Sequence, residues 1–349
     1  MIAPVTHILP LTRIRRSRML PGIGMVLAML GQRVNATDVV AEMSIPGAHV
    51  LLDIRRALGM RRYDETLKLI DRKVGDRLEK GDVIAQTDGL VQRVVRAPFT
   101  GRIIAIQKGQ VLLEQPGGKL ELKAGLTGII VDTLPDHGVV IEASGGLLQG
   151  VWGNYRTNIG LLLCQSESPD EELARSNLDM SMRGAIVQAG YLGNPDALAA
   201  ANELPIRGLI LGSMASHLIP AAMKVSFPIL LTEGFGRIPM NSKAYTMLRT
   251  NEKRDVSLNS NWDPNLGDRP ELFIPLPADG NPVLDTTEFQ PGKTVRIHSA
   301  PYFGLVGVIS VVRSGQTRFA NGLRAPAADV RLENGQVVSL PLANIDVLE

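Results

Sequence analysis

Residues 31–42, GQRVNATDVVAE, return as GDRLEKGDVIAQ at residues 75–86, so the front of the chain contains an internal duplication. A second pair follows: TGRIIAIQKGQVLLE at 100–114 is echoed by TGIIVDTLPDHGVVIE at 127–142. Each member of this pair begins with Thr-Gly and continues into two apolar runs separated by a turn. Repeats of this kind constrain the architecture before any single motif does. They predict paired short strands and turns, a duplicated β region over residues 1–150.

The composition points to a mostly β protein. The chain has 349 residues, of which 44% are hydrophobic and only 4% aromatic, with 35 glycines and 22 prolines. That balance is typical of globular chains with many strands and tight turns, and a chain of this length has room for several domains. We therefore expect an α+β fold in which strands predominate.

Metal and cofactor chemistry is not supported by the cysteine and histidine content. The one cysteine, Cys164, lies in the apolar run IGLLLC, where a buried small side chain is expected, and it has no partner for an internal disulfide. The five histidines (residues 7, 49, 137, 217 and 298) show no ligand spacing. The sequence predicts no metal site and no cofactor, and it permits a reducing compartment, so we expect a cytoplasmic location.

The N-terminal stretch has a mixed character. RIRRSR at 13–18, followed by MLPGIGMVLAML at 19–30, imitates the basic and apolar parts of a secretory signal. Pro21, Gly22 and Gly24 interrupt the apolar part, and the stretch runs directly into the repeat, so we expect it to belong to the fold. No apolar run approaches the roughly 18 residues that span a bilayer, and we predict no transmembrane segment.

Positive charge is concentrated near the N-terminus, where residues 1–62 hold nine arginines against three acids although the whole chain has a net charge of only +2. Such a cluster can meet phosphates or an acidic partner surface. The alternative is a solvated face of a small β domain, because no aromatic side chains alternate with the arginines to stack on bases. The candidate partner-binding residues are Arg13, Arg15, Arg16, Arg18, Arg55, Arg56, Arg61 and Arg62.

The second repeat resembles a known module. VGDRLEKGDVIAQ, followed by VVRAPFTGRIIAI, is similar to the barrel-sandwich hybrid of biotinyl and lipoyl carrier domains, over residues 74–114 and in part over 22–42. The resemblance implies a flattened barrel of two half-repeats. Carrier domains attach their prosthetic group to a lysine at a hairpin tip, and the corresponding TDGLVQRV at 87–94 contains no lysine. The resemblance therefore implies a docking or structural module without carrier activity.

The middle of the chain changes pattern after a junction at residues 151–180. Trp152 and Tyr155 in the junction are candidates either for packing or for stacking on a ligand, and residues 166–180 read as an acidic helical linker that begins at Ser168 or Pro169. Residues 181–250 then predict a small parallel βαβαβ module, Rossmann-like in kind. Its expected strands are 184–190, 206–213 and 227–234, and its expected helices are 195–204, 216–225 and 241–250.

The C-terminal part predicts a second β module. Residues 251–290, rich in Asn, Asp and Pro, read as a long connection. Residues 291–349 then open with GKTVRIHSAPYFGLVGVISVV, which resembles the KOW motif of transcription-elongation and ribosomal proteins and implies an SH3-like barrel. Asn334-Gly335 between alternating apolar residues predicts a tight hairpin. Gly292, Val295, Ile297, Gly304, Gly307 and Ile309 account for the KOW match.

Ligands in open parallel sheets collect at the carboxyl ends of the strands, and this edge supplies the candidate ligand-binding residues. The alternative is that the glycines at these strand ends, Gly190 and Gly234 among them, serve only the turns, since neither a G-x-G-x-x-G nor a phosphate-loop motif is present. Ser216 and His217 are expected at a helix start, with Ser216 as N-cap rather than nucleophile. The candidates are Gly190, Tyr191, Ser213, Ser216, Thr232, Glu233 and Gly234.

These patterns favour a non-catalytic scaffold or adaptor that binds protein or ribonucleoprotein partners through its β modules, and self-assembly suits such a chain. Two alternatives remain open. One is a small-ligand sensor or enzyme that uses the α/β loops. The other is a nucleic-acid-associated factor that acts through the KOW-like tail, whose binding would weaken steeply with salt.

Overall fold

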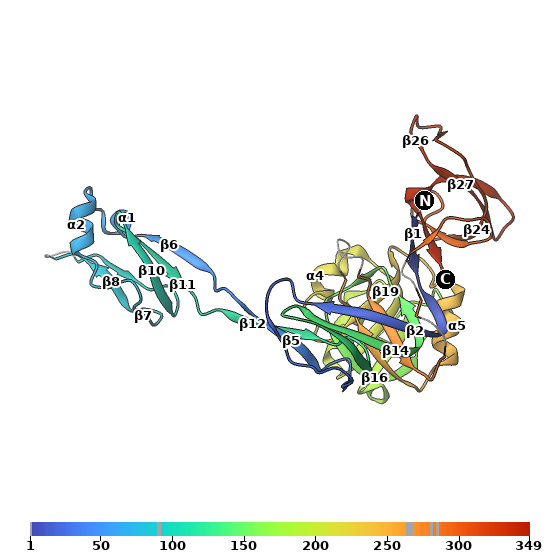
Figure 1. Ribbon diagram of the computed structural model, residues 1–349, viewed down its shortest axis with the longest axis horizontal. Coiled ribbons are helices and arrows are strands. Elements are labelled where there is room, and N and C mark those ends of the chain that lie inside the picture. The colour runs from blue at the N-terminus through green and yellow to red at the C-terminus, as the bar shows by residue number, and fades with distance from the viewer. Residues whose placement is uncertain (1, 89–91, 263–267, 280–281, 284–285) are drawn as a thin grey trace. The chain divides into compact units, whose positions relative to one another are not determined.

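The computed structural model describes residues 2–88, 92–262, 268–279, 282–283 and 286–349. The chain is mostly β and forms two compact units (Figure 1). One, here the outer unit, comprises Met1–Met19, Val26–Val40 and Leu122–Glu349, and the other, the inner unit, comprises Leu20–Met25 and Ala41–Glu121. The inner unit is thus an insertion in the chain of the outer unit, and the region expected over residues 1–150 is divided between them.

The inner unit is built on a four-stranded sheet of order β6-β11-β10-β7, accompanied by the β8–β9 pair. Its core consists of fully buried aliphatic side chains such as Ile54, Ile84 and Leu113. The short helix α1 begins after Asp53, whose carboxylate accepts from the Arg56 amide. The elements are β6 (His49–Asp53), α1 (Ile54–Leu58), α2 (Tyr63–Lys68), β7 (Arg77–Leu78), β8 (Val83–Gln86), β9 (Val94–Arg96), β10 (Gly101–Gln107) and β11 (Gln110–Glu114).

The two sequence repeats make the same hydrogen bonds in the two units. In the outer unit the Gly31 amide donates to the Ile130 carbonyl at 2.8 Å, and in the inner unit the Gly75 amide donates to the Ile103 carbonyl at 2.7 Å. The turn that follows is closed in both cases by an aspartate carboxylate that accepts a backbone amide three residues earlier. The two closing contacts are Asn35 N to Asp38 Oδ2 at 2.8 Å and Glu79 N to Asp82 Oδ2 at 2.9 Å.

The second halves of the repeats also match in register. The outer β13–β14 hairpin has an irregularity between Ile130 and Asp132, and the inner β10–β11 hairpin has one between Ile103 and Ala105. The closing glutamates are paired alike, Glu142 opposite Arg15 on β2 and Glu114 opposite His49 on β6. The elements of this repeat in the outer unit are β2 (Ile8–Met19), β4 (Arg33–Val34), β13 (Gly128–Leu134) and β14 (Gly138–Gln149). The residues of β3 (Met25–Val26), β5 (Val39–Ile45) and β12 (Gly118–Lys123) are divided between the two units.

The two repeats therefore make matching backbone contacts, and one lies within the other along the chain; they are called here the outer copy and the inner copy. Ala124 donates to the Asp38 carbonyl at 2.9 Å where Ala97 donates to the Asp82 carbonyl at 2.8 Å, so β5 and β12 correspond to β8 and β9. In the inner copy β8 pairs antiparallel with β9, and residues 89–91 between them lie outside the described residues. The outer copy instead passes through the whole inner unit at this point.

The outer unit continues into an 11-stranded sheet of order β15-β19-β18-β17-β16-β20-β21-β14-β13-β4, with β2 pairing to β14. Strands β16 to β19 are parallel, which confirms the predicted βαβαβ arrangement. Apolar clusters lie on both faces of this part. Its elements are β15 (Trp152–Gly153), β16 (Thr157–Cys164), β17 (Ala185–Leu192), α3 (Pro195–Glu203), β18 (Gly208–Met214), η3 (Ser216–Leu218), α4 (Ile219–Ala222), β19 (Ile229–Phe235), α5 (Ser242–Thr250), β20 (Asp255–Asn259) and β21 (Glu271–Pro275).

Three details of the middle region differ from the sequence predictions. Residues 166–180 form no α-helix but only short 3-10 turns, η1 (Arg175–Asn177) and η2 (Met180–Met182), because Glu171 and Leu173 bond along the edge of β17. The expected connection over 251–290 contains β20 and β21, which join the parallel strands to β14. Ser216 makes no capping hydrogen bond, whereas Asn194 caps α3 and Asn241 caps α5.

The C-terminal residues form a seven-stranded sheet of order β22-β1-β29-β23-β24-β27-β28, in which the N-terminal strand β1 lies parallel to β29. The hairpin predicted at Asn334-Gly335 is confirmed: Leu332 donates to the Gln336 carbonyl at 2.8 Å, and Gly335 has a φ of 83°. The elements are β1 (Ile2–Thr6), β22 (Thr286–Glu288), β23 (Thr294–Ile297), β24 (Val306–Val312), β25 (Thr317–Arg318), β26 (Arg324–Ala325), β27 (Ala327–Leu332), β28 (Val337–Pro341), η4 (Leu342–Asn344) and β29 (Ile345–Leu348).

Candidate functional site

The carboxyl ends of β18 and β19 carry the polar side chains that the sequence singles out, and Ser213 is the first of them. It is fully buried. Its Oγ donates to the Ile238 carbonyl at 2.7 Å and accepts from the Ile238 amide at 3.0 Å. Both capacities of the hydroxyl are thus used to hold the segment that leads into α5.

Glu233 is also committed to contacts within the protein. Only 4% of its surface is exposed. One carboxylate oxygen accepts from the Asn241 side chain at 2.5 Å and from the Asn241 amide at 3.1 Å, and the other pairs with Arg296 at 3.3 Å. Gly234 follows with a φ of 107°, a left-handed conformation that favours glycine.

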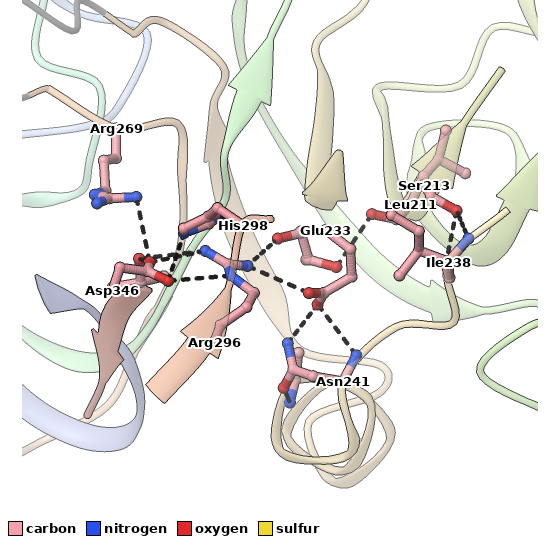
Figure 2. Close-up of polar contacts among 12 residues, drawn as sticks. Leu211, Ser213, Glu233, Ile238, Asn241, Arg269, Arg296, His298 and Asp346 are labelled. Carbon is pink, nitrogen blue, oxygen red and sulfur yellow. Dashed lines mark hydrogen bonds and ion pairs between the residues drawn. The ribbon is translucent and has the colours of Figure 1, made fainter. Parts of the chain in front are cut away.

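Arg296 lies at the centre of a buried polar network that links β19 to the C-terminal sheet (Figure 2). Its Nη1 donates to the Thr232 carbonyl at 2.6 Å, and its Nη2 pairs with Asp346 Oδ2 at 3.0 Å. Thr6 Oγ1 donates to the same carboxylate at 2.5 Å, and His298 Nε2 lies 2.7 Å from it. The network therefore joins β1, β19, β23 and β29.

Charge pairing offsets the burial of this network. Burial lowers the pKa of Arg296, but Asp346 and Glu233 outweigh it, and the net pKa is raised. Burial alone would raise the pKa of Asp346, whereas Arg296 and His298 hold it well below its usual range. Both groups are therefore charged at neutral pH, and each is satisfied by the other.

The end of β17 is covered by the chain itself. A Cβ added at Gly190 would lie 2.5 Å from the Glu171 carbonyl oxygen, so glycine permits the close approach of this segment. Tyr191 exchanges backbone bonds with Glu171 and Leu173 at 2.8 and 2.7 Å. Its ring lies under the Arg237 guanidinium, 5.3 Å from the ring centroid. Among the seven candidates, Ser216 is the exposed side chain.

The candidate arginines divide between the units. On β2, Arg13 and Arg15 pair with Glu142, and Arg16 and Arg18 are 8% and 9% exposed and pair with Glu271 at 2.9 and 2.7 Å. These four residues therefore contribute to internal ion pairs. In the inner unit, Arg55 lies over the Tyr63 ring at 5.0 Å, and the exposed side chains are those of Arg56, Arg61 and Arg62.

The two aromatic residues of the junction behave differently. Trp152 is 8% exposed and meets Phe235 edge to face at 5.5 Å, as a packed residue does. Tyr155 is 52% exposed and stacks on Trp262 at 6.3 Å. Of the two, Tyr155 is the exposed residue, while Trp152 belongs to the core.

A cavity of about 590 Å³ lies beside the Arg296 network. Arg16, Arg18 and Arg269 line it together with Glu271 and His298. The basic groups face acids already: Glu271 holds the two arginines of β2, and Arg269 lies 4.0 Å from Asp346. The cavity is therefore close to electrically balanced.

Two observations bear on thiol and metal chemistry in the described part of the chain. Burial raises the pKa of the Cys164 thiol to about 12, so a reactive thiolate is not formed at neutral pH. Among the residues described, no group of three His, Cys, Asp or Glu side chains is placed to hold a metal ion. Within the same residues, no helix is long and apolar enough to cross a membrane.

Sequence reasoning located Glu233 and Ser213 but missed the buried ion-pair network in which Glu233 takes part. Arg296 and Asp346 lie in the strands TVRI and IDVL, where a single charge among apolar residues was the available signal. Comparison with protein-family models found no matching family, and a search of curated proteins found no match.

Proposed function

We propose that the protein is a non-catalytic, multi-domain scaffold or adaptor that binds protein partners. The observation that carries this proposal is the commitment of Ser213 and Glu233 to internal bonds. At the strand ends, where a substrate would bind in an open parallel sheet, these side chains hold α5 and the C-terminal sheet in place. The α/β region therefore has a structural role, which is to connect the β modules.

The inner unit is the proposed docking module. Its matched half-repeats and its register support the view that both copies are barrel-sandwich hybrids of the biotinyl and lipoyl kind. The hairpin stretch 87–94 contains no lysine that could be modified. A carrier-like module that cannot be loaded acts through its surface, and this one displays exposed apolar side chains such as Leu51, which is 57% exposed.

Site-specific photo-crosslinking in the source cells tests the proposal. A photoreactive amino acid replaces Leu51 or Tyr63 on the inner unit, with Val311 on the outer unit as a matched position, since all three are about half exposed. We expect discrete protein adducts from the inner positions. An absence of adducts there, together with a small molecule that binds the purified chain and is lost in Glu233→Gln, would overturn the proposal in favour of a ligand sensor or enzyme.

One observation favours a second function, association with nucleic acid. The hairpin β25–β26 places Arg318 directly opposite Arg324, and residues 313–328 contain no acid. Like charges opposite one another destabilise a strand pair unless an anion lies between them. The β23–β24 hairpin bears the KOW-like residues, which supports an SH3-like, nucleic-acid-associated reading of the tail.

The salt dependence of binding tests this second function. Single-stranded RNA is titrated with the wild-type chain and with Arg324→Glu at several salt concentrations. We expect affinity that falls with salt and a slope reduced by about one in the variant. Binding that does not depend on salt, or that is unchanged in Arg324→Glu, would exclude the hairpin as the contact.

A further inference from the structure

Each copy of the repeated module has a groove at the same place. The outer groove has a volume of about 870 Å³ and the inner groove about 690 Å³. Both are lined by the arginine of the first half-repeat, by the Thr-Gly step and by the closing glutamate. The corresponding residues are Arg33 and Arg77, Thr127-Gly128 and Thr100-Gly101, and Glu142 and Glu114.

In the outer copy, part of the chain lies along this groove. Residues 275–279, Pro-Leu-Pro-Ala-Asp, which begin at the last residue of β21, form one wall. The Leu276 amide donates to the Ser144 carbonyl at 3.1 Å, and Pro275 lies opposite Gly145 in the strand register. A Cβ on Gly145 would lie 2.0 Å from the Ile274 carbonyl oxygen, so the close approach of the segment depends on this glycine.

In the inner copy, the described residues provide no counterpart of this segment. Pro116 and Gly117 occupy the positions of Ser144 and Gly145, and both are exposed. Thr100, Arg77 and Arg102 on the same groove are exposed as well. The inner groove thus retains the outer walls except for the one that the chain itself supplies at residues 275–279.

We propose that the inner groove binds an extended, proline-containing segment of a partner protein that ends in an acidic residue. The segment would lie as residues 275–279 lie in the outer copy. An alternation of proline and an apolar residue suits this position, because an extended chain there uses few of its own amides, and proline lowers the entropy lost on binding. This inference rests on the proposed scaffold function and names its partner class.

The charges of the inner groove favour an acidic residue at the end of the bound segment. Arg102 pairs with Glu114 at 3.1 Å, whereas Arg77 has no ion-pair partner among the described residues. In the outer copy the corresponding Arg33 shares its groove with Asp279, the last residue of the internal segment. An acid at the end of a bound segment would lie in the same groove as Arg77, with which it can form an ion pair.

Fluorescence anisotropy with the full chain tests the proposal. The probe is a fluorescein-labelled peptide with the sequence of residues 272–279, and a scrambled peptide is the comparison. We expect a dissociation constant on the order of 10–100 µM, in keeping with a short segment on a small groove. The charge reversal Arg77→Glu is expected to weaken binding by about tenfold or more.

The outer copy supplies the matched control, because Arg33→Glu reverses the equivalent charge in a groove that is already lined by residues 275–279. This variant is expected to leave peptide binding unchanged. A peptide in which the final aspartate is replaced by asparagine lacks the acid that is expected to pair with Arg77. It should therefore bind wild type and Arg77→Glu equally, because the ion pair is already absent in both complexes. Both arginines are exposed, so the variants are expected to fold, which thermal unfolding verifies.

Three outcomes would overturn the inference: no difference between the peptide and its scrambled form, equal binding by Arg77→Glu, or self-association of the chain that Arg77→Glu abolishes, which would make a second copy the occupant. If the peptide fails while photo-crosslinks from Leu51 persist, the groove assignment falls and the scaffold function stands. If neither peptide binding nor photo-crosslinks are observed, the groove assignment and the scaffold function are both rejected.

Discussion

The two copies of the repeated module share their hydrogen bonds but differ in what their charged residues do. In the outer copy Glu142 is paired with Arg13 and Arg15, which holds its pKa below the usual range, chiefly through Arg15 although burial opposes it. In the inner copy Glu114 pairs with Arg102 and lies near His49, and Arg77 remains exposed. The same backbone pattern therefore occurs in two settings. In the outer copy its charged side chains are paired within a large sheet, and in the inner copy the Arg77 side chain is exposed.

The comparison predicts that losing Arg296 will affect the outer unit alone and will have the largest effect. Arg296→Met leaves Glu233 and Asp346 buried without their cation, at a cost of about 3–5 kcal/mol. Hydrogen exchange in increasing denaturant, followed by mass spectrometry, reports the two units separately. Arg313→Met, which removes an exposed pair with Asp329, is the control and should cost about 0–1 kcal/mol. Equal losses in both units would contradict the division of the chain.

A pair of equivalent core substitutions sharpens the comparison. Ile130 and Ile103 occupy the same position in the two copies and are 1% and 0% exposed. Ile130→Ala should destabilise the outer unit and Ile103→Ala the inner unit, each by about 2–5 kcal/mol through the cavity left behind. The same exchange experiment measures both. Ile129→Ala, at a side chain 43% exposed, is the control, and a change that crosses between units would refute their independence.

The two units should also respond differently to acid. Burial raises the pKa of Glu271, but Arg16 and Arg18 outweigh it and hold the net pKa below the ordinary value of 4.5. A carboxylate with a lowered pKa stabilises the fold fully above its unfolded value, and this contribution is lost as the pH falls through the folded value. The outer unit should therefore lose stability as the pH falls below about 4.5, the ordinary pKa of a glutamate carboxyl.

Denaturation of wild type and of Glu271→Gln at several pH values from about 3 to about 7 measures the effect. The variant should be less stable at neutral pH, because two buried arginines lose their acid, and its stability should fall less on acidification. An identical pH dependence in the two proteins would show that Glu271 does not contribute.

The smallest effect concerns the hairpin β25–β26, where the outer unit leaves charge unbalanced. Arg324→Glu places an acid opposite Arg318 and should stabilise the strand pair by about 0.2–1 kcal/mol. Slower hydrogen exchange at residues 317–325 is the expected result. Arg324→Gln, which removes the repulsion without adding an attraction, should give about half of this stabilisation. Faster exchange in either variant would contradict the interpretation that Arg318 and Arg324 repel each other.

The sequence predicted the elements better than their partners. The three parallel strands and the Asn334-Gly335 hairpin follow from local patterns of a few residues, and both are present. The repeated segments make matching backbone contacts. Repetition shows which segments are alike but not which of them pair. The half-repeat at 31–42 could have met either 100–114 or 127–142, and the long-range register decides for the latter.

The errors arose where tertiary contacts outweigh local preference. Residues 166–180 have the composition of an acidic helix, yet the bare backbone at Gly190 allows Glu171 to approach and bond along β17 instead. The strands β20 and β21 are hidden in a stretch rich in Asn, Asp and Pro. The ion pair between Glu233 and Arg296 could not be found from spacing, because Arg296 follows 63 residues later, and its second acid, Asp346, follows a further 50 residues on.

The nesting of one copy within the other has a kinetic consequence. Residues 31–42 emerge from the ribosome well before residues 124–142, with which they pair, and the inner copy is synthesised between them. Closing so long a loop costs conformational entropy that grows with its length. If the inner copy folds first, the open loop shortens to two neighbouring strands, so we expect the inserted module to act as an internal folding aid for the module that surrounds it.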